Sequence, residues 1–271
     1  MTWLETTSET FTARHDDRDS DDAAHVLRAL EGARERLQRT FAVDVGPLDV
    51  VLHGAEAQLD GAAPLLPVLR RLTDPAGRRY LVGWAGEREL QVLAPRVLAR
   101  RASNVEGSLE MLMLAPVALL AKRIVARANP SLRPKLGPRM LAHYSRSAWL
   151  IEGAGQFFSG QVDHVRPAIA RRLRDGAEPG FPPARGDALL LGGSVFDLLA
   201  REEGSDAAAA LARGDLSLGR AFGDRARRHT EVTWHAHLRR MAEGRQPERP
   251  RGLGSAGQGR TTGLATPRAR R

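Results

Sequence analysis

Strand-forming and helix-forming patterns occupy different parts of this 271-residue chain, and this order restricts the fold more than any other feature of the sequence. Short runs typical of β-strands lie only in the first third, at residues 10–14, 48–53, 80–84 and 89–93. Residues 21–40 keep apolar side chains at helical spacing. After Pro95 the pattern predicts helices alone, over 107–128, 139–161, 163–175, 185–203, 205–212 and 227–243. The order indicates an α+β fold, in which a small N-terminal sheet with one helix precedes a mainly helical half.

Composition divides the chain into four predicted parts. Residues 1–9 are expected to be an N-terminal extension, 10–95 a sheet-bearing subdomain, 96–243 a helical subdomain and 244–271 a basic tail. The tail has seven Arg against one Glu, is rich in Gly and Pro, and lacks an apolar period, so we expect it to be disordered. It also carries most of the net charge of +9, which weakens a nucleic-acid-binding interpretation of the whole chain.

Several classes of protein are excluded by composition. The chain has no cysteine, which rules out disulfides, thiolate zinc sites, iron–sulfur clusters and cysteine nucleophiles. The N-terminus lacks the basic and apolar regions of a signal peptide. The longest apolar run, 111–121, is shorter than the roughly 20 residues that span a bilayer. We therefore expect a cytoplasmic protein without a membrane partner.

Three segments of the helical half are similar to segments of one enzyme family. They are Trp149-Leu-Ile-Glu-Gly-Ala-Gly-Gln-Phe-Phe-Ser-Gly160, the run 188–204 with its Leu-Gly-Gly-Ser-Val-Phe, and 221–238 with its Ala-Phe-Gly and Trp-His-Ala-His-Leu. Their order and spacing resemble the thermolysin-like zinc metallopeptidases, the gluzincin or peptidase MA-like group. The resemblance covers about residues 10–243. It implies a zincin-like fold, and it places Glu152 where the family has its third zinc ligand.

The other zinc ligands of that family are missing. An active member needs His-Glu-x-x-His on the preceding helix, because two imidazoles one turn apart bind zinc and the Glu acts as general base. The alignment puts Pro116 and Leu120 at the ligand positions and Val117 at the general-base position, and all three are apolar. No His lies between His53 and His143, so this helix offers no imidazole in any register. Pro116 further predicts that the helix kinks or begins there.

The sequence therefore predicts a pseudoenzyme, a metallopeptidase-like protein without catalytic activity and without zinc or another cofactor. The resemblance implies a cleft between 10–95 and 96–243, in which the strand beside the former catalytic helix pairs with an extended peptide. Strand 89–93 is expected to play this part. Strand addition uses backbone groups, so it survives loss of the metal. The expected partner is a protein or peptide, and the candidate cleft residues are Glu89, Gln91, Leu93, Trp149 and Gly153.

Two other functions stay open at this point. A hydrolase or metallopeptidase with a rebuilt site would need Glu152 to converge with His143 or His164, although these three do not share a face of one continuous helix. The alternative interpretation of Glu152 is a structural residue near the start of its helix, held by the helix dipole or by an Arg partner. An anionic partner such as a nucleic acid would need the tail together with patches at 70–71 and 171–172.

Overall fold

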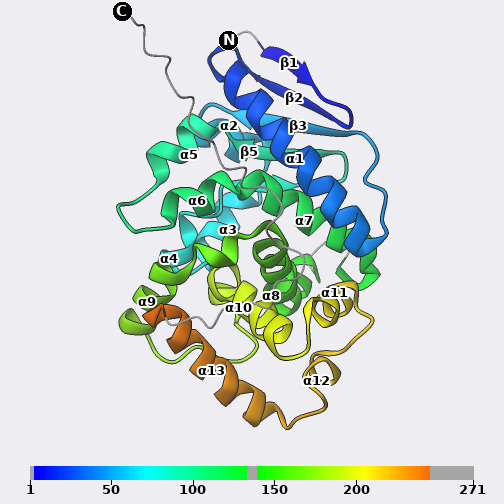
Figure 1. Cartoon of the computed structure of the whole chain (residues 1–271). Helices are drawn as coiled ribbons and strands as arrows, with labels where there is room; N and C mark the ends of the chain where they lie inside the picture. Colours follow the sequence, from blue (N-terminus) through cyan, green and yellow to red (C-terminus); the bar gives the residue numbers. More distant parts are fainter. Residues whose placement is uncertain (1–2, 133–138, 245–271) are drawn as a thin grey trace, which may run out of the picture.

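The computed structural model describes residues 3–132 and 139–244, without the side chains of residues 139–145 and 185 (Figure 1). The N-terminal part forms one five-stranded sheet with the order β1-β2-β3-β5-β4. Its strands are β1 (Trp3–Thr7), β2 (Phe11–Asp16), β3 (Leu48–His53), β4 (Gly83–Ala85) and β5 (Glu89–Leu93). The three central strands run parallel, and each outer strand is antiparallel to its neighbour. The mixed α+β class expected from the sequence is confirmed.

The first helix, α1 (Ser20–Phe41), connects β2 to β3 and covers one face of the sheet. Asp21 and Asp22 in its first turn complement the helix dipole, and its buried side chains recur at helical spacing. It ends at Ala42, whose φ of 50° turns the chain away from the helix. Val50 on β3 pairs with Ala13 on β2, and Leu90 on β5 pairs with Val50, so these three buried residues lie on one face of the sheet.

Helix α7 (Ala115–Ala128) covers the same face at its other end, where it contacts β4 and β5. It is preceded by α6 (Ser108–Met113), so the single helix predicted over 107–128 is wrong: the chain breaks at Leu114. Pro116 lies in the first turn of α7. A backbone N–H there would have no intrahelical acceptor, so the N–H that proline lacks costs the helix no hydrogen bond. The prediction that the helix begins near Pro116 is confirmed.

The remaining helices fill the connections and the C-terminal half. Short helices follow β3 and β5, namely α2 (Glu56–Ala62), α3 (Leu66–Leu72), α4 (Pro75–Arg78) and α5 (Pro95–Arg101). The second half adds α8 (Arg139–Ser159), α9 (Arg166–Asp175), α10 (Arg185–Glu202), α11 (Ser205–Arg213), α12 (Leu218–Ala221) and α13 (Arg227–Glu243). Figure 1 shows the sheet and α1 at one end of the molecule and α13 at the other. The pair α8 and α10 makes the largest contact between elements.

Two sequence-based boundaries need correction. Residues 3–7, predicted as part of an extension, form β1 and pair with β2. The predicted strand 80–84 is a strand only from Gly83 onward, because Tyr80 follows α4 in a turn. The sheet and the helical half also share one contiguous core, which extends from Phe11 on β2 through Leu120 on α7 to Trp234 on α13. Residues 245–271 of the predicted tail lie outside the described residues. In the part that is described, each helix is too short or too polar to cross a bilayer.

Candidate functional site

An ion pair joins α7 to α8 at the position where the sequence analysis placed a degenerate metal site. The ammonium nitrogen of Lys122 lies 2.5 Å from the Oε2 atom of Glu152. The two side chains are 17% and 7% exposed, respectively, so water screens the pair poorly. Glu152 therefore has a basic partner, but this partner is a lysine on the neighbouring helix and not the expected arginine.

Gly155 makes room for this lysine. A Cβ atom at residue 155 would lie 2.7 Å from Cγ and 2.8 Å from Cε of Lys122, and 3.2 Å from the carbonyl oxygen of Ala118. Ala118 and Lys122 are four residues apart and therefore lie on one face of α7. That face packs on α8, and the bare backbone at Gly155 lets the aliphatic part of the lysine cross the helix surface toward Glu152.

The other side of α8 is held by α10. Gly153 packs directly on Gly192, since a Cβ atom at residue 153 would lie 2.5 Å from the carbonyl oxygen of Gly192. Gln156 adds two hydrogen bonds across the same contact, donating to the Leu189 carbonyl at 2.5 Å and accepting from the Gly193 amide at 2.8 Å. These contacts fix the position of α8, and with it the direction of the Glu152 carboxylate.

The residues predicted at ligand positions on α7 do not lie on the side of the helix that meets Glu152. Leu120 precedes Lys122 by two positions, which is a rotation of about 200° around a helix, so it lies on the opposite side of α7 from Glu152. Leu120 is fully buried, and Pro116 and Val117 are buried as well. The α7 residues that lie against Gly155 of α8 are Ala118 and Lys122. The sequence could not predict which residues of α7 meet Glu152, because this depends on the rotation of α7 against α8.

The residues present do not fit the zinc that the resemblance implies. Zinc needs three or more side chains with free electron pairs, whereas a protonated lysine beside Glu152 is only a donor. The described residues contain no group of three or more His, Asp or Glu side chains that could hold a metal ion. His164 lies beyond the end of α8, where its carbonyl oxygen packs on Gly107. The side chain of His143 lies outside the described part of the chain.

The strand predicted to accept a peptide is also corrected. Glu89, Gln91 and Leu93 lie on β5, which is paired on both sides, with β3 and with β4. Gln91 and Leu93 are buried, and the Oε1 atom of Gln91 accepts a short hydrogen bond from the Nε2 atom of His53. The outer strand next to α7 is β4. Sequence alone placed 89–93 there because a hairpin pattern does not say which of its two strands lies outside.

The two remaining cleft candidates lie in a helix interface. Trp149 is half-buried on α8, with its ring centroid 6.4 Å from that of Phe196 on α10. Gly153 touches Gly192, as described above. Two hollows formed by the described residues lie elsewhere, one between β1 and α1 and one beside α9, and neither is lined by Lys122, Glu152 or β4.

The arginine patches expected to contact an anion are largely used within the fold. Arg70 donates to the Leu81 carbonyl at 3.1 Å and pairs with Asp60 at 2.5 Å. Arg172 makes two hydrogen bonds with the Asp187 carboxylate, at 2.7 and 2.8 Å. Hydrogen bonding to Asp187 raises the pKa of Arg172 in spite of its partial burial. Arg70 and Arg172 are therefore engaged within the fold and are not free to bind an anion.

Sequence reasoning missed Lys122, although one signal pointed to it. Arginine is the usual basic residue of this chain, and lysine occurs only at residues 122 and 135. A lysine that ends an apolar run in such a sequence marks a position where a compact ammonium ion is required. Comparison with protein-family models, with curated proteins and with solved structures found no match for this chain. Its function is therefore inferred from its own residues.

Proposed function

We propose that this chain is a catalytically inactive, zincin-like protein that binds an extended segment of a partner protein beside α7, along the edge strand β4. The Lys122–Glu152 ion pair carries this proposal. It gives Glu152 the cationic partner that a zinc ion would supply, on a helix, α7, that has no imidazole. A fixed ammonium ion neutralises the carboxylate but cannot polarise a water molecule as a metal does. This arrangement supports a protein that keeps the zincin-like scaffold but does not hydrolyse peptides.

Strand β4 has the features that strand addition requires. The Leu93 amide donates to the Val82 carbonyl, and the Gly86 amide donates to the Glu89 carbonyl. Because hydrogen-bonded residues alternate along an antiparallel pair, the backbone N–H and C=O groups of Trp84 are directed at β5. Gly83 and Ala85 then direct their N–H and C=O groups outward. Among the described residues, no strand pairs with this outer side of β4. A partner segment could bond there while α7 supports the sheet below it.

Restoring a metal site tests the zincin-like part of the proposal. We expect Ala118→His with Lys122→His to place two imidazoles opposite Glu152, and about one zinc per chain to be found by mass spectrometry of tag-free protein. The matched control is Pro116→His with Leu120→His, which keeps the spacing but faces away from Glu152. Adding Glu152→Gln to the first variant should remove the metal. Zinc retention by both pairs, or by neither, would contradict the proposed geometry. Zinc bound by the unmodified chain would favour the rebuilt-site alternative.

A second test addresses the partner. The substitution Ala85→Pro removes an outward N–H of β4 without removing a bond to β5. We expect partner proteins retained by the unmodified chain to be lost by this variant and kept by Arg88→Gln, an exposed change in the adjoining turn. Circular dichroism would establish that both variants are folded. Equal retention by the two variants would show that β4 is not the binding strand.

A further inference from the structure

The opposite edge of the sheet is formed by β1, which is also open. β1 pairs with β2 along one side, and no strand among the described residues pairs with its other side. The Ser8 amide donates to the Phe11 carbonyl at 2.8 Å. Because hydrogen-bonded residues alternate along an antiparallel pair, this bond identifies which residues of β1 bond to β2. Glu5 and Thr7 therefore direct their N–H and C=O groups away from β2. Trp3 at the start of the strand is 46% exposed.

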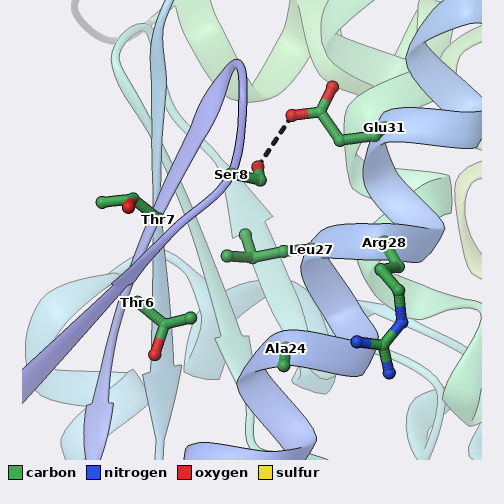
Figure 2. A pocket seen from close by; sticks show the side chains of 7 residues that line it. All are labelled: Thr6, Thr7, Ser8, Ala24, Leu27, Arg28 and Glu31. Atoms are coloured by element: carbon green, nitrogen blue, oxygen red, sulfur yellow. Dashed lines mark hydrogen bonds between the residues drawn. The ribbon is translucent and has the colours of Figure 1, made fainter.

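A hollow of about 280 Å³ lies between this edge and α1 (Figure 2). The β1–β2 hairpin contributes Thr6, Thr7 and Ser8 to its lining, and α1 contributes Ala24 and Leu27 as an apolar floor. Thr6 pairs with the buried Ala13, so its side chain lies on the face that α1 covers. A strand added to β1 would consequently run beside α1 and direct every second side chain into this hollow.

One charged group of the hollow is already used within the fold. Glu31 accepts hydrogen bonds at Oε1 from the Ser8 hydroxyl and the Thr10 amide, both at 2.7 Å. Its Oε2 accepts a hydrogen bond from Arg34 at 2.8 Å. Figure 2 shows the Glu31 carboxylate directed at Ser8, with the hydrogen bond between them. Glu31 thus closes the hairpin against α1 and is not available to a ligand.

Arg28 is the charged group that remains. It lines the same hollow one helical turn from Ala24, and within the described residues its guanidinium makes no hydrogen bond or ion pair. A guanidinium binds a carboxylate through two parallel hydrogen bonds. The Glu31 carboxylate lines the same hollow, so the local charge accommodates one added carboxylate better than several.

We propose that β1 and α1 form a binding site for an extended segment of a partner protein that carries one acidic side chain. The backbone of the segment bonds to the outward groups of Glu5 and Thr7, and its carboxylate binds Arg28 above the floor formed by Ala24 and Leu27. The site lies at the edge of the sheet opposite β4. It does not depend on the zincin-like interpretation or on the Lys122–Glu152 ion pair.

The test uses defined probes with the full chain. One probe is an acetylated and amidated nonapeptide of alternating Thr and Val with a single central Glu, and the matched probe has Gln in its place. We expect the Glu peptide to bind about tenfold more tightly than the Gln peptide, because a charge-assisted bond to Arg28 is lost. Amide shifts in NMR spectra should be confined to β1 and α1. Binding of neither peptide at millimolar concentration would overturn the proposal.

Three variants make the test specific. Arg28→Gln should remove the preference for the Glu peptide, whereas Arg36→Gln, on α1 outside the hollow, should keep it. Glu5→Pro removes an outward amide of β1 and should weaken both peptides about tenfold, with circular dichroism as the check of folding. An unchanged preference in Arg28→Gln would overturn the proposal, as would unchanged affinity in Glu5→Pro. Self-association of the unmodified chain that Glu5→Pro abolishes would identify a second copy as the occupant and overturn it too.

Discussion

Lys122 on α7 and Glu152 on α8 form a largely buried ion pair, with 2.5 Å between the ammonium nitrogen and Oε2. Lys122→Met removes this cation from beside the buried carboxylate, and we expect the change to lower the free energy of unfolding by about 3 kcal/mol. Lys122→Met combined with Glu152→Gln should cost less than the lysine change alone, because no buried charge is left. Urea unfolding of the four proteins in this cycle measures the coupling. Strictly additive costs would show that the two charges do not interact.

The contact of Gly153 with Gly192 allows no side chain at either residue. A Cβ atom at residue 153 would lie 2.5 Å from backbone atoms of α10, which cannot move as a flexible side chain would. We expect Gly153→Ala to cost about 2–3 kcal/mol, at the upper end of the usual range for an overpacked interior. The matched control is Gly32→Ala on the exposed face of α1, where nothing lies within 4 Å. It should stabilise the protein by about 0.5–1 kcal/mol. Thermal unfolding would distinguish the two, and equal effects would contradict the close contact.

Glu31 gives the hairpin a pH-dependent stability. Burial on its own would raise the pKa of Glu31, but hydrogen bonds from Ser8, Thr10 and Arg34 outweigh it, and the pKa is lowered. A carboxyl whose pKa is lower in the folded state stabilises the fold above its unfolded pKa of about 4.3. This contribution is lost as the pH falls through the lower folded pKa. Unfolding free energies of the unmodified chain and Glu31→Gln should therefore differ most at neutral pH and converge in acid. A difference that does not vary with pH would contradict this assignment.

Arg172 has a structural function that lysine cannot replace. Its guanidinium binds both oxygens of Asp187 and also donates to the carbonyl of Ala177 at 3.0 Å. Arg172→Lys keeps the charge but loses the paired geometry, so we expect a cost of about 1–2 kcal/mol in chemical unfolding. Arg171→Gln removes only an exposed ion pair with Asp175 and should cost less than about 0.5 kcal/mol. A cost for Arg172→Lys as small as that of Arg171→Gln would show that charge alone matters at this position.

Elements with many buried side chains were predictable from sequence, and β1 shows why others were not. Strands 48–53 and 89–93 are buried along almost their whole length, and the long helix after the first strand repeats its buried residues at helical spacing. The side chains of β1 are almost all exposed, so its sequence carries no pattern of burial. The helices between β3 and β4 span seven residues or fewer, which is too short for a helical period to stand out.

The candidate site was predictable only in the residue that the resemblance named. The resemblance named Glu152, but the identity of its partner follows from packing. Gly155 admits the stem of Lys122, and the rotation of α7 decides that Ala118 rather than Leu120 faces α8. Neither property is local in sequence. The side-chain period of a helix predicts a buried face, but not which buried residue meets a given atom of the next helix.

The strand order of the sheet also has a consequence for how the chain folds. Each outer strand is joined to its neighbour by a short turn, whereas β2 meets β3 only across α1 and β3 meets β5 only across α2, α3 and α4. Closing such long loops costs chain entropy before any bond is gained. We expect the two hairpins to gain protection in pulsed hydrogen exchange earlier than the amides that join the parallel strands. The edges of this sheet would then form before its centre.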